Sequence, residues 1–488
     1  MVELLEVLCE PSRYASGAVA MSDDQGCITG HELVARVAGL AEEFGTLPQV
    51  IGLLGVNGID WAAALLAAWT SGKTVVPIPT FFSRRQLEHV LHDAGITQVV
   101  ATPDAFATVA ALGVGATSIS QKRADQTPFV SSGAGMIVYT SGSTGRPKGV
   151  RLGLEQIDCQ ARALAAAIKA EPRDVNLSVL PLALLLETIT AICVPVLIGA
   201  RTHFASALAE NIGAGRPADL TWPFWEVQPT TAVLVPQLLA GLVAQLAARN
   251  LRAPASLRFV AVGGARVAET LTARAWALGI PVHEGYGLTE CCSVVSLNRP
   301  GRRRAGTVGE PLPGLDVCIE DGEIVVRGPT IMDGYLHGPR AEGLWRTGDL
   351  GERDGDGFLS VTGRKDNLLV TANGRNISPE WIEAMVLSDP RVAACVLFDH
   401  DTSQLSMLLI PSQHGEEWLM ESPRAHILLW LEQICIDAPV YAVPKDFVVC
   451  PMAQAKRIGL LTANGRVVRE AAHGIYPALK VARRPVAA

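Results

Sequence analysis

Residues 139–150 read YTSGSTGRPKGV, a run of small hydroxylated residues and glycines closed by a single lysine. Glycine lets the backbone turn its amides toward an anion, and Ser and Thr hydroxyls donate further hydrogen bonds. Lys148 adds a positive charge. A flexible surface linker is the alternative, but strand-like apolar runs flank the stretch, GMIVYT before it and GVRL after it. The pattern favours a loop that wraps a phosphate, although it is not the Walker pattern.

Four further stretches combine glycine with residues that could bind or orient a ligand. They are VGGARV at 262–267, HEGYGLTE at 283–290, LWRTGDL at 344–350 and TGRKDNLLVTANGRNISPEWIE at 362–383. Each alone is as typical of a turn or of packing, because Gly-Gly and Gly-Asp pairs are common turn sequences. Five such stretches in this order are hard to obtain by chance.

Alternating strands and helices must position these stretches. Strand-like and helix-like segments alternate from about residue 49 to about residue 280. The first strand-like segments are QVIGLLGVN, TVVPIP and ITQVVAT, and the helix-like segments between them are GIDWAAALLAAWTSG and SRRQLEHVLHDAG. Such alternation predicts α/β layers with mostly parallel sheets. After about residue 297, Gly, Pro and short strands predict a small antiparallel barrel or distorted sheet. Short strands and helices return after residue 364, which places a domain boundary at 365–366.

Composition limits the class of protein. The 488 residues are 49% apolar and 18% charged, which predicts a large buried core divided over more than one domain. A net charge of −7 and the lack of a basic block argue against a nucleic-acid surface. The ten cysteines form no Cys-x-x-Cys pair and no zinc spacing, so we expect buried thiols in a reducing cytoplasm. The N-terminus does not resemble a signal peptide.

Residues 177–200, LSVLPLALLLETITAICVPVLIGA, are nearly all apolar and raise the question of a membrane span. Glu187 would place a charge at the middle of such a span, and prolines 181 and 195 would interrupt its helix. We therefore predict a buried strand, turn and helix here.

The five stretches together resemble the motifs of the adenylate-forming superfamily, which includes acyl-CoA synthetases, luciferases and the adenylation domains of peptide synthetases. The resemblance runs from about residue 28 to 469. It implies an α/β fold with a large N-terminal domain, 1–365, and a small mobile α+β C-terminal domain, 366–488. Two mostly parallel sheet subdomains and a small β-barrel would make up the larger domain. ATP, Mg²⁺ and CoA are the implied cofactors.

The resemblance also implies a role for each motif residue. The 140–148 loop would hold the β- and γ-phosphates of ATP, Thr289 would bind the α-phosphate, and Glu290 would hold Mg²⁺. Adenine would lie between Tyr286 and the 263–265 backbone, and Asp349 would accept both ribose hydroxyls with help from Arg364. The residues implied in cofactor binding are Thr140, Ser141, Gly142, Ser143, Thr144, Gly145, Lys148, Gly263, Gly264, Ala265, Glu284, Gly285, Tyr286, Gly287, Asp349 and Arg364.

The implied reaction has two steps. A carboxylate first attacks the α-phosphorus, pyrophosphate leaves, and an acyl-adenylate forms. In the family the small domain then rotates about a hinge, which matches Asp366 here. Gly374, in the loop TANGRN, would let the pantetheine arm pass, so that a thiol can attack the acyl-adenylate and release AMP.

The acid is expected to be apolar. Amino-acid adenylation domains carry an aspartate near the LPL sequence to bind the substrate ammonium, and VLPLALLLETIT has no acid before Glu187. A buried ammonium without a counter-charge would be costly. LPLALLLE, PTFFSRRQ and LLTANGRVVR resemble fatty acyl-CoA synthetases, which favours a medium-chain, long-chain, aryl or terpenoid acid. No carrier-protein domain follows, so the acceptor would be free CoA or a separate carrier protein.

Two positions depart from these relatives. Leu184 stands where they carry a histidine or aromatic gate beside the carboxylate. Arg466 stands where they carry the lysine that bridges the acid and the α-phosphate; the chain has 8 lysines against 33 arginines, so compositional drift is an alternative. The leading interpretation is a complete acyl-CoA synthetase. A ligase that only converts a preformed acyl-adenylate, a synthetase serving a carrier protein, and a non-catalytic nucleotide-binding protein remain open.

Overall fold

Strand–helix alternation builds two large sheets in the first part of the chain, as the sequence predicts. The fold is taken from a computed structural model. It describes residues 2–10, 14–15, 17–124, 128, 131–140, 147–214, 216, 218–370, 376–401, 404–461 and 467–482.

The first sheet has seven strands in the order β18-β8-β7-β4-β3-β5-β6. Its β7, β4, β3, β5 and β6 run parallel, and the short hydrophobic runs predicted as strands are buried in it. β8 and β18 add antiparallel strands at one edge. The elements of this sheet and its helices are β3 (Val50–Leu54), α3 (Ile59–Thr70), β4 (Thr74–Ile78), α4 (Arg84–Asp93), β5 (Gln98–Ala101), α5 (Phe106–Ala111), β6 (Gly115–Ser118), β7 (Gly135–Thr140), β8 (Lys148–Gly153) and β18 (Gly334–Tyr335).

The second sheet has nine strands in the order β15-β14-β13-β12-β11-β9-β10-β1-β2. Its six central strands are parallel, and β2, β14 and β15 are antiparallel at the edges. Its strands are β1 (Val19–Asp23), β2 (Gly26–Thr29), β9 (Val175–Ser178), β10 (Arg201–Phe204), β11 (Thr231–Leu234), β12 (Phe259–Val262), β13 (Val282–Leu288), β14 (Ser293–Leu297) and β15 (Glu310–Pro311). The helices before and between them are α1 (Glu3–Cys9), α2 (Gly30–Phe44), α6 (Leu154–Ala167), α7 (Leu185–Thr188), α8 (Val194–Ile198), α9 (Ser206–Gly213), α10 (Thr221–Val227), α11 (Pro236–Ala248) and α12 (Glu269–Ala277).

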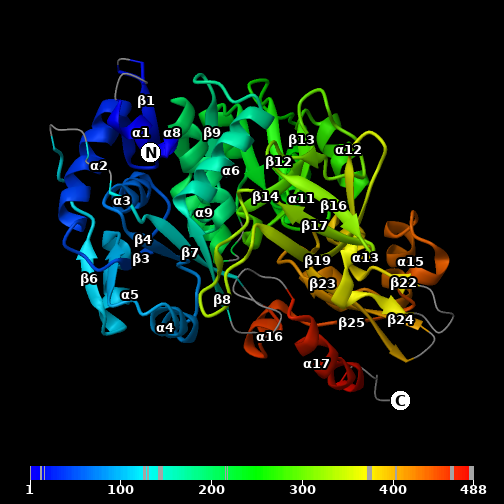
Figure 1. The fold of residues 1–488 in the computed structure, drawn as a ribbon. Coiled ribbons are helices and arrows are strands. Elements are labelled where there is room, and N and C mark those ends of the chain that lie inside the picture. The colour runs from blue at the N-terminus through cyan, green and yellow to red at the C-terminus, as the bar shows by residue number, and fades with distance from the viewer. Residues whose placement is uncertain are drawn as a thin grey trace.

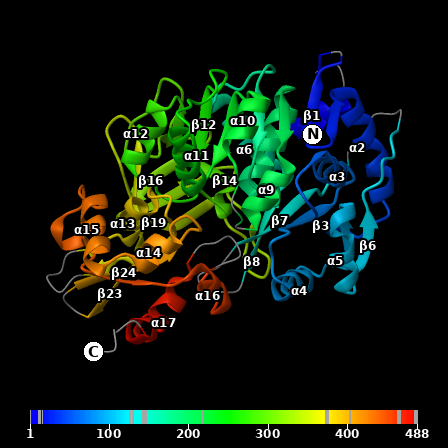
Figure 2. The same ribbon diagram turned by 180° about the vertical axis from the view of Figure 1, so that it is seen from behind.

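Smaller units complete the chain. The small antiparallel unit expected after residue 297 is a four-stranded sheet in the order β16-β17-β19-β20. The C-terminal part is α+β, with a three-stranded sheet and a two-stranded one. Its orange elements lie near β19, and the red α16 and α17 lie beyond them, away from the blue N-terminus (Figures 1 and 2). The elements are β16 (Asp316–Glu320), β17 (Glu323–Arg327), β19 (Leu344–Arg353), β20 (Leu359–Arg364), β21 (Leu369–Val370), β22 (Asn376–Ile377), α13 (Pro379–Leu387), β23 (Val392–Asp401), β24 (Gln404–Pro411), α14 (Glu416–Glu421), α15 (Arg424–Ile434), β25 (Asp446–Val449), α16 (Met452–Arg457) and α17 (Arg469–Ala482).

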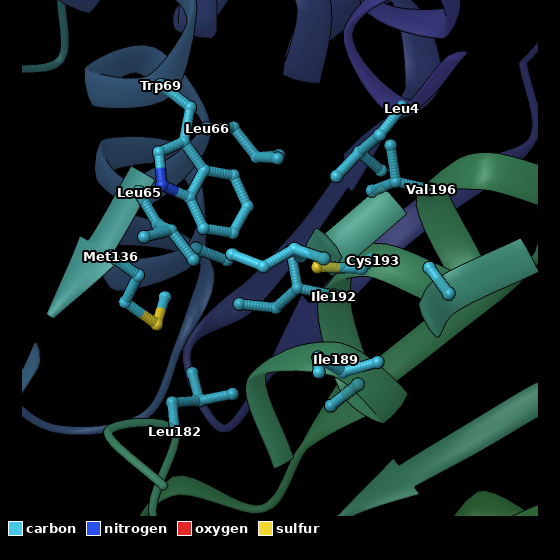
Figure 3. Close-up of a cluster of buried hydrophobic side chains, with 14 of the residues drawn as sticks. Leu4, Leu65, Leu66, Trp69, Met136, Leu182, Ile189, Ile192, Cys193 and Val196 are labelled. Carbon is cyan, nitrogen blue, oxygen red and sulfur yellow. The ribbon is translucent and has the colours of Figure 1, made fainter. Parts of the chain in front are cut away.

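The apolar stretch at 177–200 is a buried strand, turn and helix, as predicted. β9 leads through a turn into α7, a π-helical turn (Ile189–Cys193) and α8. Figure 3 shows Leu182, Ile189 and Ile192 from this segment beside Trp69 of α3 and Met136 of β7. The segment therefore joins the cores of the two large sheets. Within the described part of the chain, no helix is long and apolar enough to cross a membrane.

The cysteines correct one expectation in part. All ten are free thiols; six are buried, three are intermediate, and Cys27 is exposed. Cys27 lies on β2, an edge strand of the nine-stranded sheet, where side chains reach solvent.

Candidate active site

All five motif stretches meet, four through side chains and the 262–267 stretch through its backbone. The contacts run along β8, β13, β18, β19 and β20 and the segments that directly follow β12 and β13. The Gly263 backbone lies against Gly285, Tyr286 reaches Asp349, and Asp349 pairs with Arg364. On the other side Glu290 reaches Tyr335, which lies beside Lys148. The contacts join both large sheets to the four-stranded sheet.

Asp349 is the centre of this arrangement. Its Oδ2 accepts a hydrogen bond of 2.6 Å from the Tyr286 hydroxyl, and its Oδ1 lies 3.0 Å from the Arg364 guanidinium. Asp349 is 7% exposed, whereas the Arg364 side chain is 48% exposed. Burial raises the pKa of Asp349 above its usual value, and the Tyr286 hydrogen bond and the Arg364 charge offset only part of that rise. The site thus holds a carboxylate that has few water contacts and can accept from a ligand's hydroxyls.

Tyr286 combines an aromatic face with a fixed hydroxyl. Burial, followed by the Asp349 charge, raises the pKa of Tyr286, so its hydroxyl stays protonated and donates to Asp349. The ring position is therefore fixed by the same carboxylate that would bind a ribose. A flat ligand could stack on such a ring.

The glycines around Tyr286 are required by close backbone approach. A Cβ on Gly263 would lie 3.1 Å from the Gly285 carbonyl oxygen, and one on Gly287 would lie 1.7 Å from the Ser293 carbonyl oxygen. Gly264 has a left-handed φ of +83°. Gly264 and Ala265 are exposed. This exposed backbone, which carries no large side chain at 263–265, leaves room for the flat face of a base.

Glu284 is occupied by protein partners. It is buried, and its carboxylate accepts from Arg303 and from Asn298, each at 3.3 Å. Its assignment to cofactor binding stays a prediction.

Glu290 provides the oxygen donor expected for a divalent cation. It follows Thr289 in a 3₁₀ turn (Thr289–Cys291), and its Oε1 accepts 2.8 Å from the Tyr335 hydroxyl. In the described ranges, no three or more His, Cys, Asp or Glu side chains form a metal cluster. A single carboxylate suits Mg²⁺, which is usually bound by one or two carboxylates plus substrate phosphates and water. Glu290 therefore fits that ion.

The two strands that flank the predicted phosphate loop are paired with each other. Thr140 ends β7 and pairs with Lys148, which begins β8. Ser141, Gly142, Ser143, Thr144 and Gly145 lie outside the described residues. Helix α4 contacts residues next to both strand ends. Its His89 contacts the Pro147 carbonyl oxygen at 3.0 Å, and its Asp93 accepts a hydrogen bond of 2.7 Å from the Tyr139 hydroxyl. A capping box between Ser83 and Gln86 starts this helix.

Asp366, the predicted hinge position, lies in a 3₁₀ turn (Lys365–Asn367) directly after β20. Its two neighbours are tethered, because Lys365 lies 3.6 Å from Glu323 and the Asn367 amide donates to Glu380 at 2.6 Å. Gly374 and Arg466, predicted to act in the second and first steps, lie outside the described residues.

The LPL region is fixed by one side chain. The Asn57 amide donates to the Leu180 carbonyl at 2.6 Å and accepts from the Leu182 amide at 2.8 Å. Leu184 follows as the half-buried N-cap of α7. Glu187, one turn later, is 1% exposed, and burial raises its pKa to about 8.

Sequence reasoning missed several residues of this region, among them Tyr335, Asp93, His89 and Asn57. Each is a single residue in a stretch with no unusual composition. Only Tyr335 had a signal, since it lies in a Gly-Tyr pair like that of Tyr286. Their roles depend on contacts between residues far apart in the chain.

Comparison with known proteins matches the AMP-binding enzyme family at residues 10–336 and the AMP-binding enzyme C-terminal domain at 366–479. The malonate–CoA ligase of Arabidopsis thaliana is 26% identical, over 81% of this chain and 73% of that protein. The long-chain-fatty-acid–CoA ligase FadD15 of Mycobacterium bovis is also 26% identical, over 69% of each chain. The Bacillus subtilis O-succinylbenzoate CoA synthetase, solved with ATP and a magnesium ion, has the same fold with a TM-score of 0.77. The two sequences are 23% identical. The match covers 95% of this chain and 98% of the synthetase chain.

Proposed function

The chain belongs to the family of AMP-binding enzymes as an AMP-forming acid–CoA ligase, and we propose that the acid it activates is apolar. The observation that carries the site assignment is the buried Asp349, held between the Tyr286 hydroxyl and the Arg364 guanidinium. A carboxylate with two oxygens can accept from both hydroxyls of a ribose. The motif roles set out above follow from placing the ribose there.

With the ribose in this position, each motif residue would contact a different part of the nucleotide. Tyr286 and the 263–265 backbone flank adenine, Asp349 holds the ribose, and Thr289 donates to the α-phosphate. The loop that ends at Lys148 holds the outer phosphates. Mg²⁺ at Glu290 supplies charge neutralisation when bound. The acid's carboxylate attacks the α-phosphorus, the bond to the bridging oxygen breaks, and pyrophosphate leaves. A thiol next attacks the acyl carbonyl, and AMP leaves.

The LPL region supports an apolar acid. Leu180, Leu182 and the following leucines offer no charge, and Leu184 replaces a polar or aromatic gate. Glu187 is the one acid of the segment, and a pKa of about 8 keeps it mostly protonated at pH 7. An ammonium or a second carboxylate on the substrate would find no counter-charge in this segment. Medium-chain, long-chain, aryl and terpenoid acids all meet this requirement, and a long-chain fatty acid is the acid named for one relative.

A second candidate function rests on Arg466. A ligase that only joins a preformed acyl-adenylate to CoA would not need the adenylation lysine. Arginine keeps the charge, but its planar fork differs in shape from the compact lysine ammonium. This candidate and the complete ligase share the nucleotide site and the second step.

The two candidates are separated by ATP–pyrophosphate exchange with a panel of acids. The panel contains octanoate, palmitate, ferulate, malonate and an α-amino acid. A complete ligase for an apolar acid exchanges with octanoate, palmitate or ferulate and not with the last two. Exchange with malonate or the amino acid alone contradicts the apolar proposal. No exchange with any acid, combined with acyl-CoA formation from synthetic octanoyl-adenylate, supports the second candidate. Thioester formed only on an added carrier protein, and not on CoA, contradicts free CoA as the acceptor.

A further inference from the structure

Strand β19 bulges at the ribose motif. Glu323 pairs with Leu350 and Val325 pairs with Arg346, so three residues of β19 oppose the single residue Ile324 of β17. These three residues are Thr347, Gly348 and Asp349. A bulge beside a site re-aims a side chain, and its backbone groups leave the regular ladder. The aim of Asp349 therefore depends on what holds this bulge.

Two neighbouring residues of β17 hold it. The Gly348 amide donates to the Glu323 carboxylate at 2.9 Å. The Thr347 hydroxyl donates to the Ile324 carbonyl at 2.8 Å and accepts from the Asp349 amide at 3.1 Å. A hydrogen bond to a carboxylate is about twice as strong as one between neutral groups. Glu323 is thus the strongest acceptor within this bulge.

The bulge has little freedom on its other side. Gly348 has a left-handed φ of +72°, and a Cβ there would lie 3.1 Å from Nη2 of Arg364. The guanidinium that pairs with Asp349 therefore lies against one face of Gly348, while Glu323 holds its amide.

Glu323 is buried, at 7% exposure, and has cations nearby. The Lys365 ammonium lies 3.6 Å from its Oε2, and the Arg346 guanidinium lies 3.7 Å from it. Both cationic side chains are more than half exposed, so solvent screens their charges. They partly neutralise the Glu323 carboxylate without forming strong ion pairs with it. Lys365 directly precedes the hinge position Asp366. The same carboxylate therefore contacts the ribose bulge and the start of the hinge.

We propose that Glu323 is a positioning residue of the nucleotide site. By accepting the hydrogen bond from the Gly348 amide, it fixes the bulge and so orients the Asp349 side chain. It touches neither the reacting atoms nor the nucleotide itself. The inference rests on the proposed nucleotide site, because the aim of Asp349 matters only if Asp349 binds ribose. Glu323 should therefore affect nucleotide binding more than it affects the CoA or acid sites.

The chain offers a matched control in Glu320. This residue, on the neighbouring strand β16, pairs with Arg346 as Glu323 does, and with Arg327 at 2.9 Å. Its side chain is 32% exposed and is paired with these arginines at the strand surface. Glu320→Gln therefore removes a carboxylate from the same sheet and the same arginine while the hydrogen bond to Gly348 remains.

The test is calorimetric titration of AMP into the full chain for wild type, Glu323→Gln, Glu323→Ala and Glu320→Gln, with melting curves for each. Glutamine keeps the size and a weaker acceptor, so Glu323→Gln should raise the AMP Kd about threefold, and Glu323→Ala about tenfold or more. Glu320→Gln should leave the AMP Kd unchanged. In steady-state assays Glu323→Gln should raise KM for ATP while KM for CoA stays constant, whereas a merely structural role would lower kcat with KM unchanged.

Two results overturn the inference alone. Either both Glu323 variants bind AMP within about twofold of wild type while Asp349→Ala does not bind, or Glu320→Gln weakens AMP as much as Glu323→Gln does. If wild type itself does not bind AMP, the proposed nucleotide site fails, and this inference fails with it.

Discussion

Among single residues, Asp349 joins β19, β13 and β20 through its contacts with Tyr286 and Arg364. Asp349→Ala should abolish detectable AMP binding and leave the fold intact, because losing a charged acceptor for two hydroxyls costs about 2–4 kcal/mol. Calorimetric titration of AMP measures the loss, and a melting curve checks the fold. Asp354→Ala, at an exposed carboxylate in the turn directly after β19, should bind AMP like wild type. Unchanged AMP affinity in Asp349→Ala would remove the ribose assignment.

The protonation of Asp349 gives a second prediction. Burial raises its pKa, and the Tyr286 hydroxyl opposes that rise by donating to the carboxylate. AMP affinity should therefore fall as the pH drops, starting at a higher pH than an ordinary aspartate would give. Tyr286→Phe removes the donor and should shift this fall to still higher pH, with a loss of about tenfold or less at pH 7. Titrations of AMP between pH 4 and pH 8 test the shift; identical pH profiles for both proteins would contradict it.

The residues assigned to nucleotide binding could be predicted from motifs, whereas the residues that hold them in place could not. Asp349, Arg364 and Tyr286 lie in glycine-rich stretches of unusual composition, and the structure brings them together. Glu323 and Asn57 lie in runs that any strand or turn could contain. Their roles come from hydrogen bonds across 25 and about 120 residues of chain, which no local pattern records.

Among the elements, the parallel strands were predictable because strands buried on both faces read as unbroken Val/Ile/Leu runs. The helices between them were predictable from their apolar period and caps. The pairing of β1 with β10 was not, since these strands are far apart in the chain. Nor was the π-helical turn after α7, because it lies in a segment with no polar face to give a period.

The α7 segment carries a prediction about stability. Glu187 is buried, and its pKa of about 8 lies above the ordinary glutamate value. The folded state thus retains this proton to a higher pH than the unfolded state. The stability that the group provides therefore declines as the pH rises above the ordinary glutamate pKa of 4.5 and is lost once the pH has passed through about 8. Wild type should lose about 1 kcal/mol from this group between pH 7 and pH 9, and Glu187→Gln should not.

Urea unfolding of both proteins at pH 6, 7, 8 and 9 tests this prediction. The informative quantity is the difference in unfolding free energy between wild type and Glu187→Gln as the pH changes, since any constant packing cost of glutamine cancels. A difference that stays constant from pH 7 to pH 9 would contradict a neutral Glu187.

For the whole molecule, the order of motifs was enough to predict the family, the two large sheets and the α+β C-terminal part. The domain boundary at 365–366 and the rotation about Asp366 stay predictions. So does the acid, because an apolar pocket specifies hydrophobicity and not a particular chain length.

The small domain carries the prediction about Arg466, which lies outside the described residues. Adenylation needs one cation between two oxygens, and an error near 1 Å can cost about a hundredfold in rate. Arg466→Lys should raise pyrophosphate exchange at least about tenfold while thioester formation from acyl-adenylate stays constant. Arg457→Lys, at an exposed arginine of α16, is the control for a general effect of the exchange. If wild type already adenylates its acid at several per second and the lysine variant is no faster, Arg466 is compositional drift.

The most direct measurement is the conversion of synthetic octanoyl-adenylate and CoA, followed by mass spectrometry of both products. It tests the step that the complete ligase and the thioester-forming ligase share. Wild type should release octanoyl-CoA and AMP in equal amounts, and Asp349→Ala should lose this activity while Asp354→Ala keeps it. Octanoyl-CoA that forms equally fast with Asp349→Ala would contradict the assignment of this site to an AMP-forming acid–CoA ligase. So would acyl-CoA that forms no faster than without enzyme from octanoyl-, palmitoyl- and feruloyl-adenylate alike.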